Sequence, residues 1–380
     1  MTRYKKSSMQ NRYWLQTMYS IMIAAVVMSL GGSASAQSVP AAPASAAAAG
    51  QAMAPSTPVP VGGNISSDSM KPRIVEDFST PSLEGSDLKT WDVISGDANT
   101  IDNAYIQEVT RVQWRPGDPV DLYIVKPVGV KNPPVILYLY SYPFETDRFL
   151  NHDFCKFLVK NGYAAVAFAS ALTGPRYHDV ALKQWFVSEL RESLATSAHD
   201  VQMILNYLAT RGDVDMNRVG MFGDGSGASI AILAAAVDSR IKTLDLLDPW
   251  GDWPDWIAKS TRIPERERPD YLKPDWLAAV APLDPVKWLP QLKTQKIRIQ
   301  FVRDVGITPA DVQQKIEAAV PARAKIVHYD NAAAFRTAIA GGTGFDWIKQ
   351  NTQFGVEPGY SAAGQGQQKG PSNRRKDAQR

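Results

Sequence analysis

The sequence predicts an α/β fold built around one doubly wound, mostly parallel sheet. Strand-like and helix-like segments alternate from residue 105 to residue 352, and the central strand-like runs are apolar at nearly every position. Continuous apolar runs of this kind are typical of parallel strands that helices cover on both faces. The 380 residues are 44% apolar, which is enough for a sizeable core.

The expected elements follow in chain order. IQEVTRVQW (106–114) and VDLYIVKP (120–127) are strand-like and are separated by the turn residues RPGD. PVILYLYS (134–141) and YAAVAFA (163–169) are predicted to be buried strands, and DFCKFLVK (153–160) between them has a helical pattern. The later expected elements are a helix at 193–211, a strand at 218–222, an Ala-rich helix to 236, strands at 241–247 and 296–302, a helix at 310–320, a strand at 324–329 and a helix at 345–351.

An insertion of about residues 248–278 separates the strands IKTLDLL and KIRIQFV and is rich in Trp, Pro and charged residues. Its tryptophans have the size to stack on a sugar or an aromatic ligand. A simpler role is to pack a proline-rich excursion against the body, and we favour that role. The four residues are Trp250, Trp253, Trp256 and Trp276.

The first 36 residues have the pattern of a cleaved secretory signal. A basic stretch precedes the apolar run 18–30, and Ala34-Ser35-Ala36 is a small-x-small cleavage motif. The apolar run is too short to span a bilayer comfortably. We therefore predict a secreted or periplasmic protein with no transmembrane segment after signal cleavage.

Two polar segments flank the predicted domain, which covers residues 67–352. Residues 37–66 are rich in Ala, Pro, Ser and Gly and are predicted to be a linker. Residues 353–380 are predicted to be a disordered basic tail, either an anchor on the anionic envelope or a solvated terminus. The signal region and residues 369–380 carry +4 each of a total charge of +3, so the rest of the chain carries −5 and is a poor candidate for nucleic-acid binding.

No cofactor or metal is expected. The single cysteine, Cys155, excludes an internal disulfide and lies in a helical pattern, where a buried, small apolar role is expected. The four histidines are scattered, and none has metal-site spacing to another.

The segment GMFGDGSGASIAILAAA (220–236) joins the end of an apolar strand to a cluster of glycines and a helix-forming run. A strand, a sharp turn and a helix present the nucleophile in the motif Gly-x-Ser-x-Gly. The motif fits here only as Gly223-Asp224-Gly225-Ser226-Gly227. This register puts Gly225 at the nucleophile position and Ser226 one place later.

Over roughly residues 105–352 the chain resembles the α/β-hydrolase superfamily, nearest to its dienelactone hydrolase, acetyl esterase and prolyl-oligopeptidase-like members. The resemblance rests on VDMNRVGMFGDGSGA, on the first strands up to SYP (141–143), and on APLDPVKWLPQLKTQKIRIQFVRD. It implies an α/β-hydrolase fold carrying the Trp/Pro-rich insertion, and a Ser-His-Asp triad that acts on an ester or peptide.

The nucleophile position is degenerate under this resemblance, because Gly225 has no side chain. If Ser226 attacked instead, Asp224 would occupy the position two before it, where the turn prefers a small residue. If Asp224 attacked, the bulky Phe222 would take that position. Ser226 is the better of the two alternatives.

The family acid matches Asp304, with Asp311 a second candidate, although a loop-capping role fits the aspartate equally well. Tyr142, in the loop that the family uses beside the oxyanion, is either a hydroxyl donor in the pocket or a packing aromatic, and packing is favoured.

The family histidine position falls on Ala333 or Ala334, so the base is missing there. His178 is the histidine that could approach the turn from a loop. His328 lies within a predicted strand, and His199 is expected to be an exposed or capping residue on its helix.

Two functional hypotheses follow. The first is a secreted α/β-hydrolase-fold protein with lost or impaired serine-hydrolase activity that acts as a binding or interaction protein, with a pocket at the carboxyl ends of the strands. The second is an active esterase or peptidase-like serine hydrolase that uses Ser226, Asp304 and a relocated histidine. A small ester or peptide is the expected ligand in both cases.

Overall fold

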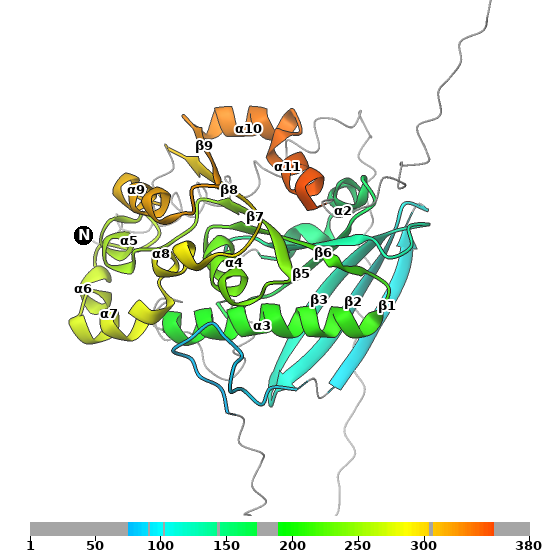
Figure 1. The fold of residues 1–380 in the computed structure, drawn as a ribbon, viewed down its shortest axis with the longest axis horizontal. Helices are drawn as coiled ribbons and strands as arrows, with labels where there is room; N and C mark the ends of the chain where they lie inside the picture. Colours follow the sequence, from blue (N-terminus) through cyan, green and yellow to red (C-terminus); the bar gives the residue numbers. More distant parts are fainter. Residues whose placement is uncertain are drawn as a thin grey trace, which may run out of the picture.

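The computed structural model describes residues 75–89, 92–101, 103–142, 145–172, 189–303 and 307–352. Its strands form one nine-stranded sheet in the order β1-β2-β3-β5-β4-β6-β7-β8-β9 (Figure 1). The pairs β1–β2, β2–β3 and β3–β5 are antiparallel and the other five pairs are parallel, so the predicted mostly parallel sheet is confirmed. The strands are β1 (Asp92–Ile101), β2 (Tyr105–Arg115), β3 (Asp118–Pro127), β4 (Pro134–Leu139), β5 (Ala164–Phe168), β6 (Asp215–Asp224), β7 (Ile241–Leu247), β8 (Lys296–Val302) and β9 (Lys325–Tyr329).

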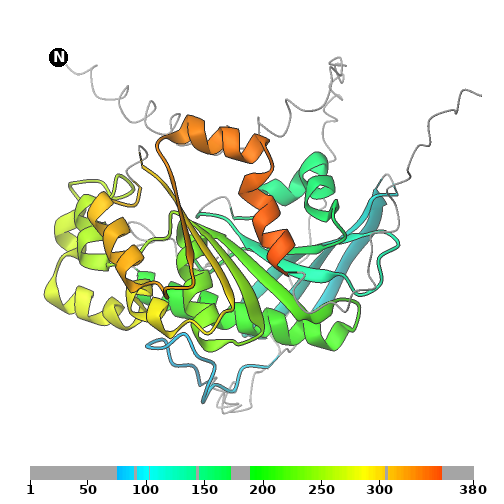
Figure 2. The same ribbon diagram turned by 45° about the horizontal axis from the view of Figure 1, so that its top comes forward.

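Helices cover both faces of the sheet. On β4, Leu137 and Leu139 pack into one core with α3 and α4, while Ile136 and Tyr138 pack into a second core with α2 and α11. Figure 2 shows α2 and α11 on one side of the sheet and the long helix α3 on the other. The helices are α2 (His152–Val159), α3 (Leu190–Arg211), α4 (Ser226–Val237), α5 (Trp253–Lys259), α6 (Arg268–Tyr271), α7 (Pro274–Val280), α8 (Pro285–Trp288), α9 (Ala310–Ala319), α10 (Ala332–Ala340) and α11 (Thr343–Thr352), with short 3-10 turns η1 (Asp147–Leu150), η4 (Ala281–Leu283) and η5 (Leu289–Gln291).

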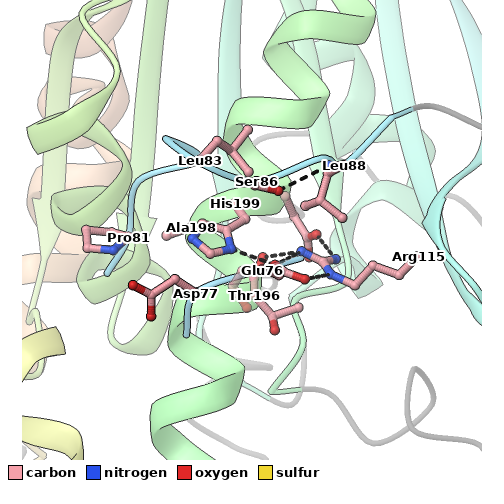
Figure 3. A network of polar contacts seen from close by, with 12 residues as sticks. Glu76, Asp77, Pro81, Leu83, Ser86, Leu88, Arg115, Thr196, Ala198 and His199 are labelled. Atoms are coloured by element: carbon pink, nitrogen blue, oxygen red, sulfur yellow. Dashed lines mark hydrogen bonds and ion pairs between the residues drawn. The ribbon is translucent and has the colours of Figure 1, made fainter. Parts of the chain in front are cut away.

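Two described segments near the N-terminal end were not assigned from the sequence. β1 adds an antiparallel edge strand to β2, and residues 75–89 pack along α3. These residues explain His199, which we expected to be exposed or capping and which is fully buried. Its Nδ1 lies 2.6 Å from Glu76 Oε1 (Figure 3). Its Nε2 lies 3.0 Å from the carbonyl oxygen of Thr80. The expectation was wrong because residues 75–89 cover this face of the helix.

The predicted insertion folds into α5, α6 and α7. Trp250, Trp253 and Trp256 are each at most 1% exposed, and the rings of Trp250 and Trp256 stack with centroids 4.6 Å apart. Trp276 is partly buried and packs edge-on against Tyr271. The packing role favoured for these tryptophans is therefore confirmed. Cys155 is also buried, on α2, as expected.

The predicted signal (1–36), linker (37–66) and basic tail (353–380) lie outside the described residues. Among the residues that are described, none of the helices combines the length and the apolar character needed to cross a bilayer.

Candidate functional site

The elbow between β6 and α4 keeps the backbone conformation of a sharp strand-to-helix turn. β6 ends at Asp224, α4 begins at Ser226, and Gly225 between them has φ 57° and ψ −115°. A residue with a Cβ rarely adopts this positive φ, whereas glycine does so without steric cost. The N–H of Gly225 donates to the carbonyl of Leu247 at 2.8 Å, which fixes the turn against the end of β7.

Two residues restrict the space that a nucleophile side chain would need at Gly225. A Cβ built there would lie 2.6 Å from Ser141 Oγ, 3.1 Å from Ser141 Cβ and 3.2 Å from Trp250 Nε1. The first distance is below any ordinary contact, so a side chain at this position requires Ser141 to move. The elbow therefore has the turn of a nucleophile, but Ser141 and Trp250 restrict the space that its side chain would need.

Ser226 is buried, and its hydroxyl is engaged in a structural contact. Its Oγ accepts a hydrogen bond of 2.9 Å from the backbone N–H of Tyr142, in the loop that follows β4. In hydrolases with this elbow, a backbone N–H from the corresponding loop helps to bind the oxyanion. Here the N–H of Tyr142, in that loop, donates to the Ser226 hydroxyl instead. The ring of Tyr142 packs against the core, which is the role favoured for it from the sequence.

The three histidines among the described residues all have partners away from Ser226. His152 Nδ1 lies 2.8 Å from the hydroxyl of Tyr105, and His199 is held by residues 75–89. His328 lies on β9, as predicted, with its Nε2 3.2 Å from Glu317 Oε1. His178 lies outside the described residues, so its catalytic role stays a prediction.

The remaining triad positions are divided between the described and the undescribed parts of the chain. Asp304 lies outside the described residues, and its role stays a prediction. Asp311, the second candidate for the acid, lies in the first turn of α9 and forms an ion pair with Lys259 at the surface. Ala333 and Ala334 lie in the first turn of α10, where the N–H of Ala334 donates to the side chain of Asn331.

Asp224 is the acidic group at the end of the elbow strand, and it is half-buried. Burial raises the pKa of its carboxyl to about 6, and the cations of Arg148 and Arg262 oppose that increase. No hydrogen bond to this carboxylate comes from any of the described residues. A carboxyl that is partly desolvated, faced by cations and not used structurally is typical of a functional position.

The two arginines are themselves incompletely engaged. The Arg148 guanidinium lies 3.9 Å from the centroid of the Tyr140 ring and forms no ion pair with the described part of the chain. Arg262, in the insertion, donates to the carbonyl of Tyr142 and lies 5.6 Å from the Trp250 ring. Its Nε is buried and has no hydrogen-bond partner among the described residues. Burial lowers the pKa of Arg262, and Asp224 opposes this.

Sequence reasoning singled out Asp224 but missed Ser141, Arg148 and Arg262. Arg262 lies in a charge-rich stretch and Arg148 in an ordinary polar turn, so no local pattern distinguishes either residue. They become recognisable only when the loops after β4 and β7 meet at the elbow.

The sheet, the helices on both of its faces and the glycine elbow define the α/β-hydrolase fold. No protein-family model and no curated protein sequence matches the chain. Among solved structures, the fold is similar to an acetyl xylan esterase from Paenibacillus sp. R4, with 16% identity, a TM-score of 0.51, and coverage of 72% of this chain and 90% of that one. It is also similar to a puromycin-hydrolyzing peptidase of Mycobacterium tuberculosis, with 13% identity, a TM-score of 0.50, and coverage of 67% of this chain and 41% of that one. At these identities the likeness concerns the fold.

Proposed function

We propose that this protein is a secreted or periplasmic binding protein that uses the α/β-hydrolase fold without serine-hydrolase chemistry. The observation that carries the proposal is the nucleophile position itself, where Gly225 has no side chain and where Ser141 and Trp250 restrict the space for one. The ligand-binding end is the carboxyl edge of the parallel strands, because ligands of open α/β sheets bind there.

The contact of Ser226 supports the same conclusion. A serine without a base is a weak nucleophile, and removal of one triad member costs on the order of 10⁴-fold in rate or more. Ser226 has no described histidine as a partner, and its hydroxyl already accepts the N–H of Tyr142. The alternative function, an esterase or peptidase-like hydrolase using Ser226, Asp304 and His178, requires this hydrogen bond to break.

The location is proposed from the N-terminal pattern alone, since Ala34-Ser35-Ala36 follows a basic and an apolar region. The basic tail supports a further proposal of association with an anionic envelope surface. Such binding would weaken with added salt and would be lost when residues 369–380 are removed.

A fluorophosphonate probe tests the absence of serine-hydrolase chemistry without any guess at the substrate. We expect the purified protein to remain unlabelled under conditions that label a known serine esterase completely. Labelling that Ser226→Ala abolishes would overturn the proposal. Ser229→Ala is the matched control, because Ser229 is another buried serine on α4, bonded to the backbone of Trp250.

A further inference from the structure

The described residues place two arginines and one carboxylate at the end of the elbow strand, with hydrogen-bonding capacity left over. Arg148 comes from η1 after β4, Arg262 from the insertion after β7, and Asp224 from β6 itself. All three are half-buried, so they are in contact with both protein and solvent. Neither arginine forms an ion pair within the described residues, and the buried Nε of Arg262 has no acceptor there.

The net charge of these three residues is +1 when Asp224 is ionised. One further negative charge would therefore neutralise the group. Guanidinium groups bind carboxylates and phosphates through paired hydrogen bonds, and this binding is strongest where water is partly excluded. The rings of Tyr140 and Trp250 already hold the two guanidinium groups through cation–π contacts, which reduces the entropy cost of ordering them around a ligand.

We propose that Arg148 and Arg262 form a binding site for the oxyanion of a small ligand, a carboxylate or a phosphate, at the carboxyl edge of the sheet beside Asp224. This site would define the class of ligand for the binding function proposed above, and the inference rests on that function. Asp224 does not bind the anion. The negative charge of ionised Asp224 repels the anion, so the protonation state of Asp224 sets the affinity of the site for the anion.

The sign of the pH dependence follows from this arrangement. The pKa of Asp224 is about 6, so its carboxyl is ionised above that pH and neutral below it. Among the described residues, the charged and titratable groups that face it are Arg148, Arg262 and Tyr140, and the pKa of Tyr140 is about 12, so none of the three changes charge in this range. The affinity for an anion that keeps its charge in this range, such as acetate, is therefore expected to rise as the pH falls through about 6.

Calorimetry with sodium acetate, sodium phosphate and uncharged acetamide, at constant ionic strength without chloride, tests the site. We expect acetate or phosphate to bind with millimolar affinity and acetamide not to bind; whichever anion binds more tightly identifies the source of the oxyanion. Arg148→Gln and Arg262→Gln should each weaken binding by about tenfold, as for loss of one charge-assisted contact. Arg266→Gln is the matched control, because this exposed arginine lies on the same insertion and should leave the affinity unchanged.

Asp224→Asn gives the sharpest result, because a residue with only a structural role would not tighten binding when it is replaced. We expect the variant to bind acetate at least roughly threefold more tightly at neutral pH, and to lose the pH dependence of acetate binding, since acetate itself stays ionised in this range. If Arg262→Gln disrupts the loop at Tyr142, Arg148→Gln still tests the site, since Arg148 contacts the Tyr140 ring whereas Arg262 holds a backbone carbonyl. Equal binding by Arg148→Gln and Arg266→Gln, weaker binding by Asp224→Asn, or no anion binding by the parent would each overturn the proposal. Probe labelling tests the loss of hydrolase chemistry separately, so the two proposals can fail independently.

Discussion

A side chain at Gly225 should destabilise the fold, and the structure gives the size of the effect. In Gly225→Ala the residue must keep φ near 57° and ψ near −115°, a sparsely populated region that costs about 1–3 kcal/mol for a residue with a Cβ. The new Cβ also meets Ser141 Oγ at 2.6 Å and Trp250 Nε1 at 3.2 Å, and overpacking of this kind costs about 1–3 kcal/mol more. We expect the free energy of unfolding to fall by about 2–6 kcal/mol.

Two further variants separate the backbone cost from the packing cost. Gly212 ends α3 with φ 69°, and a Cβ there meets nothing within 4 Å, so Gly212→Ala measures the cost of positive φ alone, about 1–2 kcal/mol. Ser141→Gly removes the two closest atoms facing Gly225. In that background Gly225→Ala should cost about 1–3 kcal/mol less than in the parent, which is the coupling energy of the double-mutant cycle.

Urea unfolding followed by circular dichroism and by tryptophan fluorescence measures all four variants on one scale. Coincident transitions by the two probes are needed before the free energies are compared. If Gly225→Ala is no more destabilising than Gly212→Ala, the space at the elbow is open and the reasoning is wrong. A coupling energy near zero would show that Ser141 does not fill that space.

Other buried groups provide further tests of the packing around the site. Ser226→Ala leaves the N–H of Tyr142 without its acceptor and should reduce stability by about 1–3 kcal/mol in urea unfolding; an unchanged midpoint would contradict the contact. Burial raises the pKa of Glu76, but its hydrogen bonds, with that from Arg115 foremost, lower it overall, so its contribution to stability is present at neutral pH and is lost as the pH falls below about 4.3. In Glu76→Gln the acid-induced loss of stability should be smaller, as measured by unfolding at a series of pH values. Burial raises the pKa of Cys155 to about 11, so its thiol should react with Ellman's reagent far faster in urea than in native buffer, and rapid native reaction would refute its burial.

The parallel half of the sheet could be predicted because its strands are buried on both faces. β4 and β5 are apolar at every position, and in a chain with alternating helices such short runs are typical of central parallel strands. β1 escaped prediction because its sequence, DVISGDANTI, mixes polar residues and glycine without a regular alternation. It lies at the edge of the sheet and pairs with β2, so it does not need the continuous apolar sequence of a central strand.

Residues 75–89 escaped prediction for a different reason. They attach to the domain through polar contacts and through the apolar side chains of Phe78, Leu83 and Leu88, whose spacing of five residues matches neither a helix nor a strand. Glu76 pairs with Arg115 at 2.6 Å and with His199, and the side chain of Gln202 donates to the carbonyl of Pro81 (Figure 3 shows the Glu76 contacts). The misjudgement of His199 followed directly, because the exposure of a residue on a helix depends on which segments cover it.

At the site, the sequence indicated the backbone and not its surroundings. A glycine between Asp224 and Ser226 at the end of an apolar strand predicts a turn of positive φ, and this local conformation depends on neighbours in the chain. The residues that fill the turn, Ser141 and Trp250, are more than eighty and about twenty-five positions away. Contacts between such distant loops depend on the tertiary fold, which a local pattern does not contain.

The backbone of Tyr142 links these separate observations. Its N–H donates to Ser226 on α4, and its carbonyl accepts from Arg262 on the insertion, so both of its polar groups are engaged within the protein. In a working hydrolase that N–H must be free for an oxyanion that forms only during the reaction. Here the helix, the loop and the insertion are joined at that point, while Trp250 closes the nucleophile space from the side. Substituting a serine at Gly225 would therefore leave the N–H of Tyr142 engaged and would place the new side chain against Ser141 and Trp250, so we expect that substitution alone not to create hydrolase activity.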